Sequence, residues 1–300
     1  MAAPQSPVGS RRRLGAELRR LRLKTGLTLD DVAERMTCST SKISRLETGK
    51  GVPKIPDVRE LMRIYGVASD TERDMLVRLV HDGRGQGWWE SYVEGVQPER
   101  FVMDSPGRYA ALETEATTVR AFEVSWLHGL LQSPEYARVL LEAVLADDHD
   151  AGEIDRLVEM RVRRQQALAD REPPLRLDVV LDEAVLARTV ALPGIGREAL
   201  QFVLDLSARP NIVVRVLPFG AGLHRSQAGS FVVLEYPVEV GADVVYIEGH
   251  AGETYLEGDS DVDLYKDVLN DASARALDPG ASRELIRRYQ DTRSPGKARP

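Results

Sequence analysis

Residues 27–50, LTLDDVAERMTCSTSKISRLETGK, decide the fold of the N-terminal part of this chain. Apolar residues recur there at helical spacing in two short runs, and the small polar residues 37–41 separate the runs. Thr28 and Ser39 stand where a helix N-cap belongs, and Gly49 stands where the second helix should end. The stretch therefore predicts two short helices joined by a tight turn.

Three further amphipathic segments surround this pair. Before it, RRRLGAELRRLRLKTG (11–26) places leucines at i, i+4 and i+7. After it come PDVRELMRIYG (56–66) and TERDMLVRLVHDG (71–83), each with an apolar stripe at the same period. We expect an all-α domain of five helices over residues 11–82, preceded by a disordered tail over residues 1–10.

The run from Arg11 to about Val67 resembles the helix-turn-helix domain of the Xre and lambda-repressor-like family, with residues 27–50 carrying the family signature. The resemblance implies that the second and third helices form the DNA-reading pair. It also implies an internal ion pair between Arg22 and Glu47, for which two solvated charges are the alternative.

The groove-facing residues can also be argued from chemistry. The major groove admits one helix, and the planar guanidinium of Arg45 can bind O6 and N7 of a guanine. Short hydroxyl side chains can contact base edges or phosphates, and lysines contact phosphates that set the register. The alternative for any single residue is a solvated surface. The predicted DNA-binding set is Thr28, Ser39, Thr40, Ser41, Lys42, Ser44, Arg45 and Lys50.

The charge of the chain is divided unevenly. Residues 1–66 hold 14 Lys and Arg against 7 Asp and Glu, whereas the rest of the chain holds 26 against 40. A basic N-terminal part followed by an acidic remainder is typical of a nucleic-acid-binding domain attached to a domain with another role.

Residues 83–293 have a different pattern, which predicts an α+β domain, followed by a disordered tail over residues 294–300. Short β-branched runs bounded by Pro, Gly or Asn indicate strands at 119–124, 175–184, 211–219, 230–236 and 243–249. Helical periodicity indicates helices from Tyr109, after Ser133, over 153–170, and at 196–208, 262–276 and 279–292. Three arginines of the 153–170 helix, Arg161, Arg163 and Arg164, are expected on a solvated face.

This second segment resembles the large C-terminal domain of unknown function that follows Xre heads in actinobacterial regulators. The resemblance rests on LLQSPEYARVLL, LDVVLDEAVL, NIVVRVLPFGAGLH, GSFVVLEY and VVYIE. It implies an antitoxin-like transcription regulator that binds DNA as a homodimer and binds a small partner protein encoded nearby. A different hypothesis is a small-molecule sensor, in which the glycine-rich loop 217–231 closes over a ligand; an ordinary mobile connection is the alternative for that loop.

We find no catalytic constellation, and we predict no enzyme, no metal and no cofactor. The histidines lack metal-ligand spacing, although His224, Glu248 and His250 could converge if their strands are adjacent; ordinary polar surface is the alternative. One cysteine cannot form an internal disulfide, and no run of 18 apolar residues exists for a membrane span. We expect a cytoplasmic protein without a membrane partner.

Overall fold

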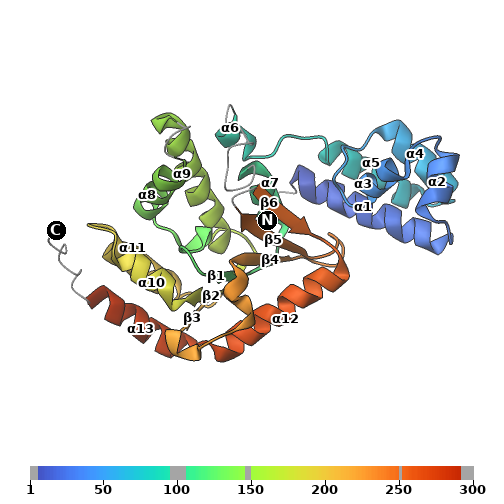
Figure 1. The fold of residues 1–300 in the computed structure, drawn as a ribbon. Coiled ribbons are helices and arrows are strands. Elements are labelled where there is room, and N and C mark those ends of the chain that lie inside the picture. Colours follow the sequence, from blue (N-terminus) through green and yellow to red (C-terminus); the bar gives the residue numbers. More distant parts are fainter. Residues whose placement is uncertain (1–5, 95–105, 146–149, 250–251, 292–300) are drawn as a thin grey trace. The chain divides into compact units, whose positions relative to one another are not determined.

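The structure is a computed structural model that describes residues 6–94, 106–145, 150–249 and 252–291 (Figure 1). Its contacts divide the chain into two units. Residues 1–90, 110–115 and 236–242 form unit 1, and the remaining residues form unit 2. Each unit is described by itself.

Unit 1 contains a bundle of short helices. They are α1 (Pro7–Lys24), α2 (Leu29–Arg35), α3 (Thr40–Glu47), α4 (Ile55–Ile64) and α5 (Asp70–Asp82). A further short helix, α6 (Glu90–Val93), follows at the boundary, and all of it after Glu90 belongs to unit 2. Helix α1 begins earlier than predicted, so the tail expected over residues 1–10 is wrong for residues 7–10. The physical reason is that Ser6 accepts a hydrogen bond from the backbone N–H of Gly9, and Pro7 occupies the first helical position.

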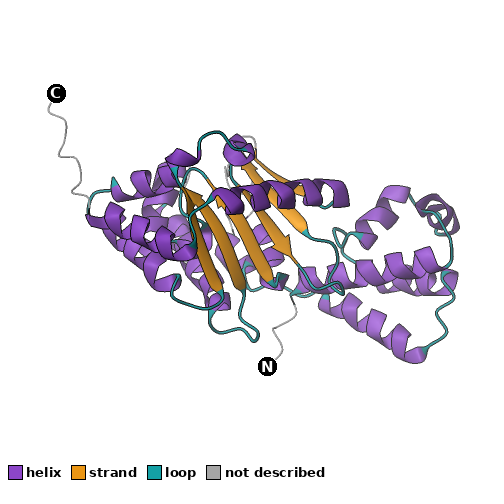
Figure 2. Cartoon of the chain, turned by 90° about the horizontal axis from the view of Figure 1, so that it is seen from below, coloured by secondary structure: helices purple, strands orange, loops and turns teal. Residues whose placement is uncertain are grey.

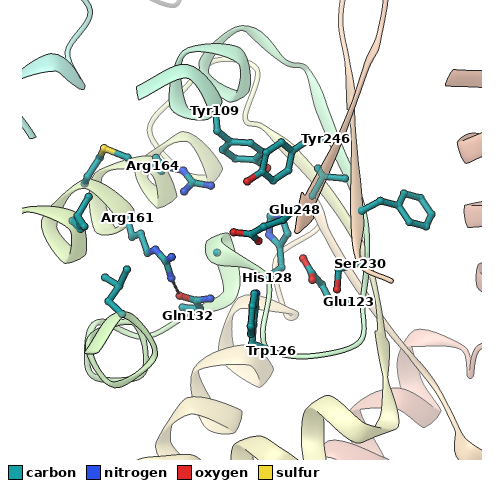
Figure 3. Close-up of a pocket in the computed structure, with 16 residues that line it drawn as sticks. Tyr109, Glu123, Trp126, His128, Gln132, Arg161, Arg164, Ser230, Tyr246 and Glu248 are labelled. Carbon is teal, nitrogen blue, oxygen red and sulfur yellow. Dashed lines mark hydrogen bonds between the residues drawn. The ribbon is translucent and has the colours of Figure 1, made fainter. Parts of the chain in front are cut away.

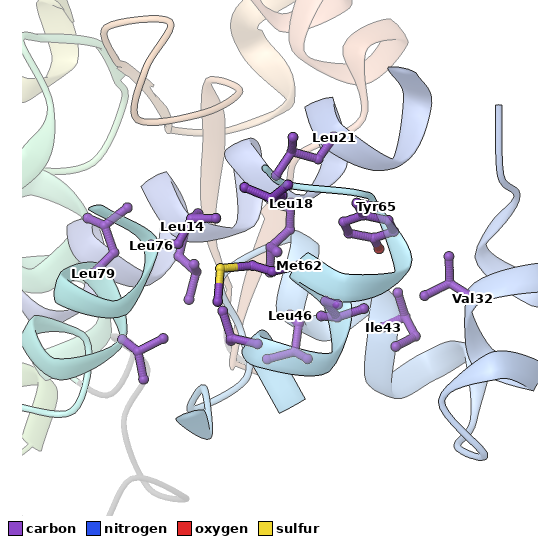
Figure 4. Packing of buried hydrophobic residues seen from close by; sticks show 14 of the residues in the cluster. Leu14, Leu18, Leu21, Val32, Ile43, Leu46, Met62, Tyr65, Leu76 and Leu79 are labelled. Atoms are coloured by element: carbon purple, nitrogen blue, oxygen red, sulfur yellow. The ribbon is translucent and has the colours of Figure 1, made fainter. Parts of the chain in front are cut away.

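The core of this bundle is built from the apolar stripes that the sequence shows (Figure 4). Leu14 and Leu18 of α1, Ile43 of α3 and Leu76 of α5 are at most 1% exposed. Burying one such side chain contributes about 1.5 to 3 kcal/mol relative to leaving it in water. Gly15 allows α1 to approach α3 closely, because a Cβ atom there would meet the backbone of Glu47. The apolar side chains within the stretch 27–50 therefore pack α2 and α3 against α1.

Unit 2 is organised around a six-stranded mixed sheet. Its strands are β1 (Thr118–Glu123), β2 (Arg176–Asp182), β3 (Ile212–Leu217), β4 (Phe231–Glu235), β5 (Val244–Gly249) and β6 (Gly252–Leu256). The order is β3-β2-β1-β4-β5-β6. The first three strands are parallel, and β4, β5 and β6 continue the sheet with antiparallel pairing. Strands β2 and β3 therefore extend the sheet on one side of β1, and β4, β5 and β6 extend it on the other side.

Helices cover this sheet. They are α8 (Pro134–Leu145), α9 (Ala151–Gln165), α10 (Glu183–Val190), α11 (Gly196–Leu206), α12 (Asp259–Arg275) and α13 (Pro279–Asp291). Helix α7 (Pro106–Glu115) precedes β1. Helix α12 lies across one face of the sheet, where Leu269 and Ala272 pack against Phe122, Val233 and Val245 (Figure 2). Residues that alternate with Phe122 along β1 point to the opposite face.

The expectation of a helical helix-turn-helix domain followed by an α+β domain is confirmed. Helix α6 and two elements of unit 2 were not expected from the sequence. Strand β6 (Gly252–Leu256) pairs with β5, and α10 (Glu183–Val190) begins where Asp182 accepts a hydrogen bond from the backbone of Ala184.

Candidate functional site

Helices α2 and α3 form a capped pair whose exposed side carries the predicted DNA-binding residues. Thr28 and Asp31 make a reciprocal capping box at the start of α2, and Ser39 caps α3 by accepting from the backbone of Lys42. The hydrogen bonds to Thr28 also hold the pKa of Asp31 below its usual value. These caps place six of the eight predicted residues in exposed positions, with Thr40 and Ser44 half-buried.

Two of the eight residues are already engaged by neighbouring carboxylates. Thr40 donates its hydroxyl to Asp30 at 2.6 Å, and the ammonium of Lys42 lies 2.9 Å from Asp57. A phosphate or base would have to compete with these carboxylates. Arg45 differs, because its exposed guanidinium has no ion-pair partner within the part of the chain that the structure describes. It is the best placed of the set for direct base contact.

The structure brings Arg22 and Glu47 together in a buried, bidentate ion pair. The Nε of Arg22 lies 2.7 Å from one carboxylate oxygen of Glu47, and its Nη2 lies 2.9 Å from the other. A third bond runs from Arg22 to the carbonyl of Leu27 at 2.9 Å. Hydrogen bonding to Glu47 raises the pKa of Arg22 above its usual value. The pair ties α1 to the end of α3 and to the chain entering α2.

A cavity of about 800 Å³, counting space open to solvent, lies on the face of the sheet opposite α12. The register explains its polar floor. Val232 pairs with both Ala121 and Tyr246, so these residues share a face, and Glu123 and Glu248 follow two residues later on the same face. The position lies beyond the carboxyl end of β1, where strand order reverses; open α/β sheets commonly bind ligands at such a position. The residues lining the cavity are Tyr109, Glu123, Trp126, His128, Gly129, Gln132, Leu141, Leu157, Met160, Arg161, Arg164, Ser230, Phe231, Val232, Tyr246 and Glu248.

One wall is a buried polar network. His128 accepts a hydrogen bond at Nδ1 from the backbone of Leu130 at 3.2 Å. Burial, together with the charges of Arg164 and Arg161, lowers the pKa of His128 to about 3, so its imidazole is neutral with the proton on Nε2. Gln132 accepts a hydrogen bond from Arg161 and donates to the carbonyl of Leu127. Arg161 is almost fully buried, and this network fixes its side chain beside the cavity.

Two carboxyl groups on the sheet have raised pKa values. Burial raises the pKa of Glu123 to about 8, opposed by a hydrogen bond from Ser230. Burial raises the pKa of Glu248 to about 7, although the charges of Arg161 and Arg164 lower it. Figure 3 shows Arg161 directed toward Gln132 and Arg164 lying near Tyr109, with Glu248 on the sheet side of the cavity. Near neutral pH the cavity therefore holds two cations and partly protonated carboxyl groups, so its net charge is positive.

The solvated face predicted for three arginines of α9 is wrong for two of them. Arg161 is 4% exposed and lines the cavity, and burial lowers its pKa to about 10. Arg164 lies over the ring of Tyr109, with 4.8 Å from its guanidinium carbon to the ring centroid. Only Arg163 is exposed, near Tyr92. The sequence did contain a signal for the burial of Arg161. It follows Ile154 by seven residues, Leu157 by four and Val158 by three, which places it on the same buried face of the helix.

Other cavity residues had no sequence signal. Trp126, His128 and Gln132 lie between β1 and α8; Gln132 falls within LLQSPEYARVLL, but neither the motif nor the other two residues indicated a cavity. Their side chains meet Arg161 and Glu248 only because the sheet brings distant segments together. The loop 217–231 contributes Ser230 and Phe231 at its end.

The structure does not assemble the metal site considered from the sequence. His224 hydrogen-bonds to Ser226 and lies 3.9 Å from Asp182, whereas Glu248 lines the cavity. His250 lies outside the described residues. Over residues 6–94, 106–145, 150–249 and 252–291, no group of three His, Cys, Asp or Glu side chains could hold a metal ion. Within the same ranges, no helix is long and apolar enough to cross a membrane.

Two family models match the chain. A model described as a domain of unknown function (DUF5753) matches residues 106–288, and a model described as a helix-turn-helix domain matches residues 13–76. No curated protein matches the chain. No solved structure matches it either.

Proposed function

Because the chain belongs to the DUF5753 family and carries a helix-turn-helix domain in front of that domain, we propose that it is a sequence-specific transcription regulator controlled by a small molecule. The helix-turn-helix match supports DNA binding and a role in transcription regulation. The control by a small molecule rests on one observation, the cavity of unit 2 with its polar floor and aromatic walls. Such a protein would act on DNA in the cytoplasm.

We propose that α3 enters the major groove and that Arg45 reads a base. The opposite face of α3 is fixed by Ile43 and Leu46, so the exposed face is available for DNA. Two copies of the domain, in a homodimer of the Xre type, would read two half-sites about one or more helical turns apart. Lys50 and Thr28 would contact phosphates, and Ser39, Ser41 and Ser44 would contact either phosphates or base edges.

Arg45→Ala should weaken binding to the upstream region of the protein's own gene by about 5- to 150-fold, because a bidentate guanine contact is worth about 1 to 3 kcal/mol. It should also relax sequence preference at one base pair of each half-site. Fluorescence anisotropy with a labelled duplex, repeated with each base changed, measures both. Arg287→Ala, an exposed arginine of α13, removes the same charge outside the helix-turn-helix domain and should leave binding unchanged. Equal losses for the two variants would count against base reading by Arg45.

The proposed control can be tested with a fragment library containing neutral, cationic and anionic aromatic compounds. A compound that enters the cavity should change the fluorescence of Trp126, and the change should vanish in Trp126→Phe but persist in Trp88→Phe, which lies outside the cavity. Saturating the cavity should change DNA affinity by about 5- to 150-fold, the range of a coupling of 1 to 3 kcal/mol. DNA must change the affinity for the compound by the same factor. No binding by any class would reject the sensor proposal.

The resemblance also led to the hypothesis that the C-terminal domain binds a small, antitoxin-like partner protein. That hypothesis remains a prediction. The fragment experiment bears on it, because a cavity that binds no small molecule would leave partner binding as the stronger explanation of control.

A further inference from the structure

We propose that the ligand of this cavity is an organic anion with an apolar body, and that Glu248 takes up a proton when the anion binds. The inference rests on the proposed function, since it names the class of ligand for the same cavity. Its basis is the arrangement of two arginines, two carboxyl groups and a set of aromatic walls.

The arginines supply the attraction. Arg161 and Arg164 are three residues apart on α9, so their side chains lie on one face of the helix, and both line the cavity. Arginine presents a planar fork that suits a carboxylate or phosphate. Glu248 occupies the field of both arginines and acts as an internal counter-ion. A ligand anion would replace it in that role.

Glu248 also has an oxygen that nothing in the described residues satisfies. Its Oε1 is buried and has no hydrogen-bond partner there. A buried acceptor without a partner is unfavourable, whereas a protonated carboxyl group can donate to an incoming anion. Protonation therefore satisfies the oxygen and removes the repulsion between Glu248 and the ligand in one step.

The charged groups facing Glu248 come from several elements. Arg161 and Arg164 of α9 favour its ionised form, and Glu253 of β6 opposes it. Glu123 of β1 interacts with Glu248 electrostatically, and the imidazole of His128 is neutral. A ligand anion adds negative charge to this set. It therefore makes the carboxyl group of Glu248 harder to ionise.

The remaining walls define the body of the ligand. Tyr109 and Tyr246 form an aromatic pair with ring centroids 4.7 Å apart, and Trp126 also lines the cavity. Apolar side chains of α8 and α9 complete the lining, namely Leu141, Leu157 and Met160. This lining suits a molecule with a ring or a branched apolar group.

The affinity for an anion should fall as the pH rises. The pKa of Glu248 is about 7 and that of Glu123 is about 8, so both groups are protonated below pH 6 and both are ionised above pH 9. Ionisation adds up to two negative charges, which compete for the arginines and repel the ligand. Phenylacetate should therefore bind at least about tenfold more tightly at pH 6 than at pH 9.

The test uses the full-length protein and three matched probes: phenylacetate, phenylacetamide and phenethylamine. Isothermal titration calorimetry at pH 7 in two buffers of different ionisation enthalpy measures the protons taken up on binding. We expect phenylacetate to bind most tightly, with uptake of a fraction of one proton. Glu248→Gln should abolish most of the uptake and tighten binding at pH 9.

Variants of α9 provide the matched control. Arg164→Gln should weaken phenylacetate binding by about ten- to one-hundred-fold, the range for a lost charged hydrogen bond, whereas exposed Arg163→Gln should leave it unchanged. Circular dichroism checks that each variant folds, and the pH dependence of the unmodified protein tests the same inference without any variant.

The possible failures are distinguishable. If phenylacetamide or phenethylamine binds as tightly as phenylacetate, the anion inference is overturned while the sensor proposal stands. Binding of phenylacetate without proton uptake overturns the role of Glu248. If no probe and no member of the fragment library binds, the proposed function itself fails.

Discussion

Glu47→Ala should lower the local free energy of unfolding of the helix-turn-helix domain by about 3 to 5 kcal/mol, the usual cost of removing one partner from a buried ion pair. Arg22 is only 8% exposed in the intact protein, and the substitution removes the bidentate acceptor of its guanidinium. The remaining bond to the carbonyl of Leu27 cannot neutralise the charge. Hydrogen exchange of the α1 and α3 amides in the full-length protein measures the change.

Two comparisons separate this effect from a general loss of charge. Glu17→Ala removes a half-buried carboxylate that pairs with exposed Arg20, and surface pairs of this kind contribute at most about 1 kcal/mol. The double change Arg22→Met with Glu47→Leu replaces the pair by apolar side chains and should recover most of the lost stability. If Glu47→Ala and Glu17→Ala have equal effects, the buried pair is not the stabilising element that its geometry indicates.

Glu123→Gln should stabilise unit 2 by several kcal/mol at pH 8.5 and should have little effect at pH 4. The pKa of Glu123 is about 8 in the folded protein, against 4.5 for an ordinary glutamate, because the side chain is buried. Between these values the folded state holds a proton that the unfolded state has released. The free energy of unfolding therefore falls with rising pH across this window, at about 1.4 kcal/mol per pH unit.

Glutamine keeps an acceptor for Ser230 and cannot ionise, so the difference between variant and unmodified protein should grow from about pH 4.5 to about pH 8 and then level off. Urea denaturation at a series of pH values, followed by the fluorescence of Trp126, measures this difference. Glu142→Gln, on the exposed surface of α8, should change stability by less than about 0.5 kcal/mol at every pH. A difference that does not depend on pH would contradict the burial of an ionisable Glu123.

The helix-turn-helix part of the fold was predictable because its information is local. Caps at Thr28 and Ser39 and the stripe through Ile43 and Leu46 each lie within a few residues of the element they define. Strands β1 to β5 were predictable for the same reason, since they are short β-branched runs. Strand β6 was missed because GETYL begins with a glycine and two polar residues and lacks a β-branched apolar run, so that its pairing with β5 defines it.

The cavity could not be predicted in this way. Its polar groups come from β1, the turn after it, α9 and β5, and their meeting depends on strand order. Arg161 shows the difficulty in a single residue: an arginine within an amphipathic helix usually faces water, but here its phase in the helix continues the buried stripe. Glu123 is the last residue of β1, and Glu248 is the last but one of β5. In the sequence alone, both look like ordinary polar residues at the end of an apolar strand.

The two parts of the chain also differ in when they can form during synthesis. The core of the helix-turn-helix domain uses only residues between Leu14 and Val80, whereas the sheet pairs Phe122 with Phe231 and the cavity needs Glu248. At about 5 to 20 residues per second, a ribosome needs roughly ten to thirty seconds to pass from Val80 to Glu248. A newly made chain would therefore fold its DNA-reading helices before the ligand cavity exists.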